Sequence, residues 1–131
     1  MLEISVKTTQ KEEFIEITPR IREAIAKKGY QSGICIVYIP HTTAGVTINE
    51  NADPSVRHDI IYTLGRVIPP DWEYHHVEGN ADAHVKASLV GSSVVLVVEN
   101  GSLRLGTWQG VFFCEFDGPR SRHFWLQFMP S

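Results

Sequence analysis

The sequence predicts an α+β fold with a mixed, mostly antiparallel sheet and about three helices. Strand-like and helix-like segments follow one another without the strict alternation of a parallel βαβ sheet. Half of the predicted strands fall in the C-terminal third, where Asn100–Gly101 is a strong hairpin-turn signal. The 131 residues, 43% of them hydrophobic, contain no linker or repeat. We therefore expect a single domain over residues 1–131 that buries its own core.

The first segments are predicted to form two strands and a short helix. Leu2–Lys7 alternates apolar and polar residues as a half-buried strand does, and Phe14–Ile17 is a second, shorter strand. A helix is expected over Thr18–Lys28, with the threonine as its cap and Pro19 at its first position. Gly29 supplies the left-handed residue that ends this helix.

Two more helices and two strands are predicted for the middle of the chain. Ile34–Ile39 is a continuous apolar run with β-branched residues, as in a central strand, and Val46–Asn49 is the next strand. A cap-plus-proline pair that begins at Asp53 opens a helix whose apolar spacing continues to Val67. A long loop separates it from a third helix over Ala81–Val90.

The remaining strands are predicted in the last third of the chain, where apolar and β-branched runs dominate. They are Ser93–Glu99, Ser102–Leu105, Thr107–Phe116 and His123–Met129.

Composition excludes several classes of protein. The net charge of −3 provides no basic stripe for a nucleic acid, so we expect no nucleic-acid partner. The longest apolar run, Val94–Val98, is far too short to span a bilayer, and the N-terminus lacks the pattern of a signal peptide. Cys35 and Cys114 lie in apolar strand-like runs, which favours buried reduced thiols and a cytoplasmic protein, although a disulfide stays open.

Polar residues gather in three segments whose surroundings are otherwise apolar. These segments are His41–Thr43 with Asn49–Asp53, then Tyr74–His84, and finally Gly106–Gln109 with Glu115, Arg120 and Arg122.

The same segments carry a family resemblance. HTTAGVTINENADPSV, EGNADAHVKASLVGSS and GSLRLGTWQGVFFCEFDGPRSR strongly resemble the YjbQ-like family, whose members are often called secondary thiamine-phosphate synthases. The resemblance extends from about Ile4 to Phe128, and Gly101–Gln109 matches its most specific motif. It implies an α+β fold assembled as a homotrimer, with a thiamine phosphate synthase activity that is secondary.

Three histidines are candidate metal ligands. His41, His76 and His84 come from three separate segments, and the family motifs have histidine at these positions. Three neutral imidazoles around an open coordination position are typical of a catalytic metal site, although this spacing matches no metal-binding motif. We expect them to hold a divalent metal, Zn²⁺ or Mg²⁺. The alternative is three unrelated histidines that hydrogen-bond to loops.

The carboxylates divide between structural and chemical roles. Asp82 near the start of a predicted helix is explained by the helix dipole, and Asn80 by capping. Glu50 has no such explanation, so it is free to bind Mg²⁺ or to act as a base. Glu115 lies on a strand among apolar neighbours, where a carboxylate needs a partner. Arg120 or Arg122 is the obvious candidate, as a structural ion pair or as part of an anion site.

The cations are candidates for phosphate binding, because the planar guanidinium matches phosphate oxygens. For Lys86 a solvated surface role is the better interpretation. A tryptophan such as Trp108 is more often core or interface than a stacking platform. The residues expected to contact substrate or phosphate are Arg120, Arg122, Gln109, Thr42 and Asn49.

Three functions follow as hypotheses. The first, implied by the resemblance, is a transferase that joins a hydroxymethylpyrimidine diphosphate to a thiazole phosphate and releases pyrophosphate. Its catalytic residues would be Glu50, His41 and Arg120. The second is a metal-dependent hydrolase that uses the three histidines. The third is a non-enzymatic, ligand-binding oligomer.

The aromatic content predicts self-association. The last strand offers Trp125 and Met129 on one side and Phe124, Leu126 and Phe128 on the other. An antiparallel sheet normally exposes one face to water, so two apolar faces require a cover. A packed helix is the simpler cover, but we expect neighbouring subunits to provide it. The resemblance points to a homotrimer that associates through the sheets, with each active site drawing residues from two chains.

Overall fold

The computed structural model of the protein describes all residues from Met1 to Ser131. Its eight strands are β1 (Leu2–Lys7), β2 (Glu13–Glu16), β3 (Gly33–Tyr38), β4 (Ala44–Glu50), β5 (Ser93–Glu99), β6 (Ser102–Arg104), β7 (Gln109–Glu115) and β8 (Ser121–Pro130). Its three helices are α1 (Thr18–Lys28), α2 (Pro54–Val67) and α3 (Ala81–Val90). The α+β class is therefore confirmed, and every predicted element is present with ends shifted by at most two residues.

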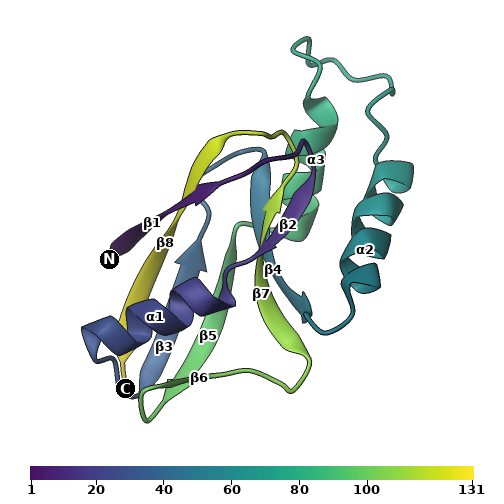
Figure 1. Cartoon of the computed structure of the whole chain (residues 1–131). Coiled ribbons are helices and arrows are strands. Elements are labelled where there is room, and N and C mark those ends of the chain that lie inside the picture. The colour runs from purple at the N-terminus through teal and green to yellow at the C-terminus, as the bar shows by residue number, and fades with distance from the viewer.

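The strands form two sheets rather than one (Figure 1). The five-stranded sheet has the order β1-β8-β3-β5-β6, and the three-stranded sheet has the order β2-β7-β4. Every pairing is antiparallel, and β3 lies at the centre of the larger sheet as its continuous apolar run predicts. The hairpin between β5 and β6 turns at Asn100 and Gly101, which both have positive φ, at 52° and 78°.

The main core lies between the two sheets and α1. One face of the larger sheet contributes Cys35, Leu96 and Leu126, and α1 contributes Ile21 and Ile25. A second, smaller core lies on the outer side of the three-stranded sheet. Its members are Phe14, Ala83, Ala87, Phe112, Cys114 and Phe116, with Ile60, Ile61, Leu64 and Val90 packed against them. Strand β7 is buried on both faces, because one side points into each core.

The ends of the helices confirm two of the predicted caps and correct two others. Gly29 ends α1 with φ 65°, and Asp53 caps α2 by accepting a hydrogen bond from the backbone amide of Ser55. Thr18, however, does not cap α1. Its hydroxyl instead accepts a hydrogen bond from the amide of Val111 at 2.8 Å, which joins the helix to β7. Asn80 stands at the cap position of α3, but its side chain makes no capping bond.

The second face of the five-stranded sheet has no helix over it. On β5, Val95 and Val97 point away from the core and are 60% and 53% exposed. Beside them lie Tyr38 and Trp125, whose rings stack at 5.4 Å, and the exposed Met129 at the end of β8. We call this surface, with Ile34 and Ile36, the open sheet face. The last strand was predicted to be apolar on both sides, and the side with Trp125 and Met129 is the one that this chain leaves uncovered.

Two further predictions concern the thiols and the membrane. Cys35 and Cys114 are both free and buried, so they form no disulfide with each other. No helix in the chain has the length and apolar character needed to cross a lipid bilayer.

Candidate functional site

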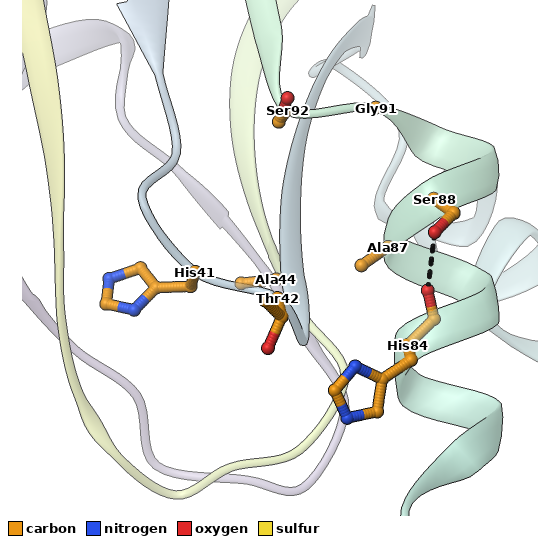
Figure 2. A pocket seen from close by; sticks show the side chains of 8 residues that line it. All are labelled: His41, Thr42, Ala44, His84, Ala87, Ser88, Gly91 and Ser92. Carbon is orange, nitrogen blue, oxygen red and sulfur yellow. Dashed lines mark hydrogen bonds between the residues drawn. The ribbon is translucent and has the colours of Figure 1, made fainter.

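A pocket of about 320 Å³ lies between the start of β4 and the inner side of α3 (Figure 2). Small residues keep the two elements close. A Cβ at Gly45 would stand only 2.7 Å from the backbone oxygen of Gly91, so this position tolerates only glycine. The residues that line the pocket are His41, Thr42, Ala44, His84, Ala87, Ser88, Gly91 and Ser92. We call it the His41–His84 pocket.

His41 is held by the backbone of β8. Strand β3 ends at Tyr38, opposite Trp125. Beyond this point the backbone of β8 contacts the His41 ring instead of the backbone of β3. Its Nε2 lies 3.1 Å from the amide nitrogen of His123 and 3.0 Å from that residue's carbonyl oxygen. Burial, together with the nearby positive charge of Arg122, lowers the pKa of His41 below its usual value of 6.5. The ring is therefore neutral at physiological pH.

His84 faces the same pocket from α3, and its ring centroid lies 5.1 Å from that of His76. The structure thus brings His41 and His84 to one pocket, and His76 next to His84. No group of three or more His, Cys, Asp or Glu side chains in the chain is arranged to hold a metal ion. Within one chain, the three histidines therefore do not fit the expected three-ligand centre.

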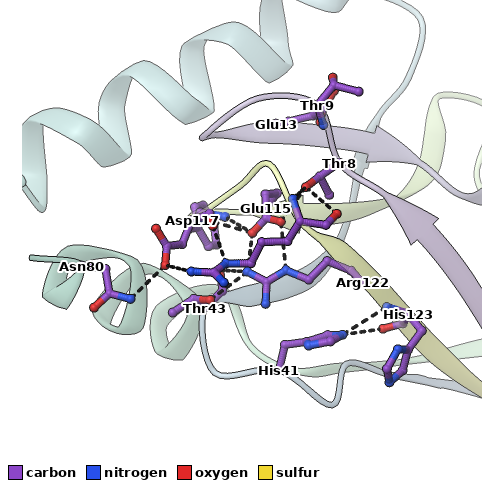
Figure 3. Close-up of polar contacts among 12 residues, drawn as sticks. Thr8, Thr9, Glu13, His41, Thr43, Asn80, Glu115, Asp117, Arg122 and His123 are labelled. Carbon is purple, nitrogen blue, oxygen red and sulfur yellow. Dashed lines mark hydrogen bonds and ion pairs between the residues drawn. The ribbon is translucent and has the colours of Figure 1, made fainter. Parts of the chain in front are cut away.

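A buried ion pair between Arg122 and Glu115 lies next to the pocket and holds Thr43, the residue that follows Thr42 of its lining (Figure 3). Arg122 donates from Nε to Glu115 Oε1 at 2.9 Å, contacts Glu115 Oε2 through Nη2, and donates from Nη2 to the Thr43 hydroxyl at 2.7 Å. Burial raises the pKa of Glu115, but hydrogen bonds from Arg122 and Thr8 outweigh it and hold the pKa below its usual value. Of the two arginines predicted as partners of Glu115, the structure pairs Arg122 with it, and Arg120 pairs with Asp117 instead.

Arg120 lies nearby but is more accessible. Its Nη2 donates to Asp117 Oδ2 at 2.9 Å, and its side chain is 52% exposed. The same carboxylate oxygen accepts a hydrogen bond from Asn80 Nδ2 at 2.8 Å, which explains why Asn80 does not cap α3. Asp117 thus connects Arg120 to the start of the helix that carries His84. Several guanidinium hydrogens of Arg120 remain free for an anion.

The interpretation of Lys86 as a solvated surface residue is wrong. Its side chain is 1% exposed and donates to Glu12 Oε2 at 2.9 Å and to Asp82 Oδ2 at 3.2 Å. Burial lowers the pKa of Lys86, but the two carboxylates outweigh it and raise the pKa above its usual value. Asp82 is consequently a buried partner of Lys86, which holds α3 against the loop between β1 and β2.

The other predicted site residues lie elsewhere in the chain. Asn49, Glu50 and Gln109 are found together where β4 ends and β7 begins, with Glu50 paired to Gln109 in register. Strand β4 has seven residues, so this end lies about 20 Å from Ala44 and the His41–His84 pocket, at ~3.3 Å per residue. Glu50 therefore does not reach His41 within one chain.

Sequence reasoning missed several pocket residues. Ser88 and Ser92 contribute hydroxyls, and Thr43 turns its hydroxyl inward to Arg122. Ser88 faces the same side of α3 as His84, at the i, i+4 spacing, and this spacing was the available sequence signal. Nothing in the sequence indicated that Ser92 would meet His41.

Comparison with family models gives one match. The model described as UPF0047 protein YjbQ-like matches residues 2–131. Among individual proteins, a UPF0047 protein of Methanocaldococcus jannaschii is 53% identical over 127 residues, covering 97% of this chain and 92% of the relative. The UPF0047 protein YugU of Bacillus subtilis is 49% identical over 129 residues, covering 96% of both chains.

Solved structures with the same fold come from bacteria and archaea. A YjbQ/UPF0047 protein from Clostridium acetobutylicum superimposes with a TM-score of 0.96 at 50% identity, covering 98% of this chain and all of that one. A YbjQ-like protein of unknown function from Sulfolobus solfataricus gives a TM-score of 0.94 at 32% identity, covering 99% of this chain and 96% of its own. The architecture described above is thus shared by these relatives.

Proposed function

The chain belongs to the YjbQ-like family of UPF0047 proteins, and on that premise we propose that it is a secondary thiamine phosphate synthase-like transferase. It would join a hydroxymethylpyrimidine diphosphate to a thiazole phosphate and release pyrophosphate. We place the diphosphate in the His41–His84 pocket. The two free thiols agree with a cytoplasmic location, which is part of the same proposal.

The reaction calls for stabilisation of negative charge. The C–O bond between the pyrimidine methylene carbon and the diphosphate breaks, and a C–N bond to the thiazole nitrogen forms. The electron pair of the broken bond leaves with pyrophosphate, while the thiazole nitrogen becomes the positive thiazolium nitrogen. No proton has to be removed, so hydrogen-bond donors and positive charge around the leaving group matter more than a general base.

The observation that carries the proposal is that no carboxylate lines the His41–His84 pocket. Its polar groups are two imidazoles and three hydroxyls. The Ser88 hydroxyl already donates to the carbonyl of His84, which leaves the hydroxyls of Thr42 and Ser92 free to donate. A site with donors and no negative side chain favours a phosphate or diphosphate over a cation.

Two arginines are proposed to supply the positive charge that the leaving group needs, Arg122 from a hollow beside the pocket and Arg120 from the residue just before β8. Arg122 lines a second hollow that shares His41, Thr42 and Ser92 with the pocket, although Glu115 offsets its charge. Arg120 has free guanidinium hydrogens and is tied through Asp117 to the start of α3. We therefore assign anion stabilisation to Arg120 and positioning of the Thr42–Thr43 segment to Arg122.

The pocket opens to solvent, and a neighbouring subunit is proposed to close it. The open sheet face runs up to the hollow beside the pocket, since Tyr38 and Trp125 belong to both. Covering that face in a homotrimer would bury its apolar side chains and exclude water from the site. Because Glu50 and Gln109 lie far from His41 in one chain, a shared site would take them from another copy.

In this proposal a divalent metal binds together with the diphosphate of the substrate and not to the protein alone. The histidines do not form a three-ligand centre, and Mg²⁺ is commonly bound through substrate phosphates. Activity should then depend on added Mg²⁺ without metal being retained by the purified protein. Metal that co-purifies and is lost on replacing His76 would contradict this part.

The test is product formation by purified protein with both substrates and Mg²⁺, detected as thiamine phosphate by its fluorescent oxidation product. His84→Ala should lower kcat/KM about 100-fold, the usual order for loss of one donor at a developing charge. His58→Ala is the matched control, because His58 is an exposed histidine on α2 outside the pocket. Absence of product from folded protein, or equal activity in the two variants, would contradict the proposal.

A further inference from the structure

We propose that the groove between the edge strand β1 and the helix α1 binds an extended acidic peptide segment of a partner protein, which adds a strand to the five-stranded sheet. Strand β1 is the outermost strand of this sheet, and α1 lies below its N-terminal half (Figure 1). A hollow of about 240 Å³ lies between the two elements. The residues that line it are Leu2, Glu3 and Ile4 of β1 and Arg20, Glu23, Ala24, Lys27 and Lys28 of α1. We call it the β1–α1 groove.

The outer edge of β1 carries free backbone groups. The amide of Thr8 donates to the carbonyl of Arg120 at 3.0 Å, so these two residues form a hydrogen-bonded pair at the end of the antiparallel ladder between β1 and β8. In such a ladder, hydrogen-bonded pairs alternate with pairs that exchange no hydrogen bond. The amides and carbonyls of Glu3, Ser5 and Lys7 therefore point away from β8.

The other side of β8 agrees with this direction. Ser5 lies opposite His123, and both the amide and the carbonyl of His123 contact the His41 ring instead. The outer edge of β1 is six residues long and has no neighbouring strand, whereas β6 at the opposite edge of the sheet has only three residues. A long, unpaired edge is a template for the addition of an extended peptide.

Apolar side chains form the floor of the groove. Leu2 and Ile4 point to the same face of β1 as the buried Val6, yet both are only half-buried. Ala24 lines the groove from α1 and leaves room beside the strand, because its side chain ends at Cβ. A strand added to the edge of β1 would cover this floor with its own alternate side chains.

The wall formed by α1 is positive, although the whole chain has a net charge of −3. Lys27 Nζ lies 2.8 Å from Glu23 Oε1, so these two charges compensate each other. Glu3 accepts a hydrogen bond at 3.0 Å from an indole on β8. Arg20 and Lys28 form no ion pair, and both side chains therefore stay available to a carboxylate.

Helix stability explains the lysines but not Arg20. Lys27 and Lys28 stand in the last turn of α1, where the helix dipole favours positive charge. Arg20 stands in the first turn, which has no acidic residue and where the dipole disfavours a cation. An anionic partner would compensate this unfavourable placement.

The spacing of the two unpaired cations defines the peptide. Arg20 and Lys28 are eight positions apart on α1, which corresponds to ~12 Å at ~1.5 Å per residue. In an extended peptide, residues four positions apart lie on the same side and ~13 Å from each other. A segment with carboxylates at positions i and i+4 and an apolar residue at i+2 therefore matches both cations and the apolar floor between them.

The inference does not depend on the proposed transferase, because the groove shares no residue with the His41–His84 pocket. The probe is a hexapeptide with blocked ends and the sequence ETVTET, added to the full chain labelled with ¹⁵N. It should shift the amide signals of Glu3 and Ser5 and slow their hydrogen exchange about tenfold or more, because these amides then donate to the peptide. Shifts without slower exchange would show charge attraction alone and overturn the proposal.

The free protein provides a second check. The outward amides of Glu3 and Ser5 should exchange faster than those of Ile4 and Val6, which donate to β8. Slow exchange at Glu3 and Ser5 before any peptide is added would mean that a second copy of the chain already pairs with this edge. That result would overturn the assignment of the edge to a partner's peptide.

Charge variants test the wall of the groove. Arg20→Gln with Lys28→Gln should weaken ETVTET binding about tenfold or more, as expected for two lost charge-assisted contacts. Lys11→Gln with Arg66→Gln is the matched control, because it removes the same charge from exposed residues elsewhere and should change affinity by no more than about twofold. The peptide KTVTKT should not bind. Equal weakening by the two pairs, or binding of KTVTKT with similar affinity, would contradict the proposal.

Backbone variants test strand addition. Ser5→Pro removes an outward amide and leaves the ladder with β8 intact, so it should abolish ETVTET binding in a folded protein. Ser5→Ala keeps the amide and should bind as the unaltered protein does. ETVTET with N-methylated amides tests the same hydrogen bonds without any change to the protein, and it should not bind. Unchanged affinity for the N-methylated peptide would show that no strand is added and that the proposal is wrong.

Discussion

Replacing Arg122 with methionine should cost about 3 kcal/mol of unfolding free energy. The Glu115 side chain is fully buried, and Arg122 supplies two of its hydrogen bonds. Removing one partner of a buried ion pair costs ~3–5 kcal/mol, because the other charge stays buried without compensation. The hydroxyl of Thr8 and the amides of Phe116 and Asp117 still donate to the carboxylate, which places the cost at the lower end of that range.

The assay is urea unfolding at pH 7, compared across three variants. Arg122→Met with Glu115→Gln should be more stable than Arg122→Met alone, because the buried charge is gone. Lys27→Met is the control, since its ion pair with Glu23 lies on the surface and should contribute nothing measurable. A loss below about 1 kcal/mol for Arg122→Met, or a double variant no more stable than the single one, would refute the reasoning.

The same pair predicts a dependence on pH. The pKa of Glu115 is lowered in the folded protein, so the unfolded chain binds more protons as pH falls. The stabilisation is fully present above about pH 4.5 and is lost as pH falls through the lower folded pKa. The double variant Arg122→Met/Glu115→Gln should lose less stability over this interval than the unaltered protein. If unfolding free energy falls with pH equally in the two proteins, the attribution of this pH dependence to Glu115 is wrong.

The remaining predictions concern α3, assembly and the thiols. Lys86→Met leaves Asp82 buried without its partner and should cost about 3 kcal/mol in urea unfolding, whereas a solvated lysine would cost almost nothing. Val97→Glu places a charge on the open sheet face and should convert a particle of roughly three times 14.8 kDa into a monomer in sedimentation equilibrium; a monomer before the change would refute the trimer. Burial raises the pKa of Cys35 to about 11 and raises that of Cys114 further, so neither thiol should react with a disulfide reagent until the protein unfolds.

Local sequence patterns predicted the elements well. The positive φ of Gly29 and of Asn100–Gly101 follows from the residues themselves, and the continuous apolar run at Ile34–Ile39 is explained by a strand buried at the centre of a sheet. The division into two sheets could not be predicted, because pairing partners such as Leu2 and Leu126 are far apart in sequence.

The site was harder to predict because it depends on long-range packing. Lysine is a residue type that usually lies on the surface. Lys86 is buried because the loop that carries Glu12 packs against α3, which the sequence does not reveal. Glu50 and His41 are nine positions apart, yet an extended strand places them at opposite ends of β4. A carboxylate on a buried strand needs a partner, which predicted Arg120 or Arg122 for Glu115, and only the structure shows that the partner is Arg122.

The central claim is that the His41–His84 pocket holds the diphosphate of the substrate, and a crystal structure of the protein with pyrophosphate tests it most directly. We predict pyrophosphate in contact with the hydroxyls of Thr42 and Ser92 and the ring of His84, at 2.7–3.2 Å. Pyrophosphate bound only elsewhere, or an empty pocket at a concentration that inhibits product formation, would contradict the account.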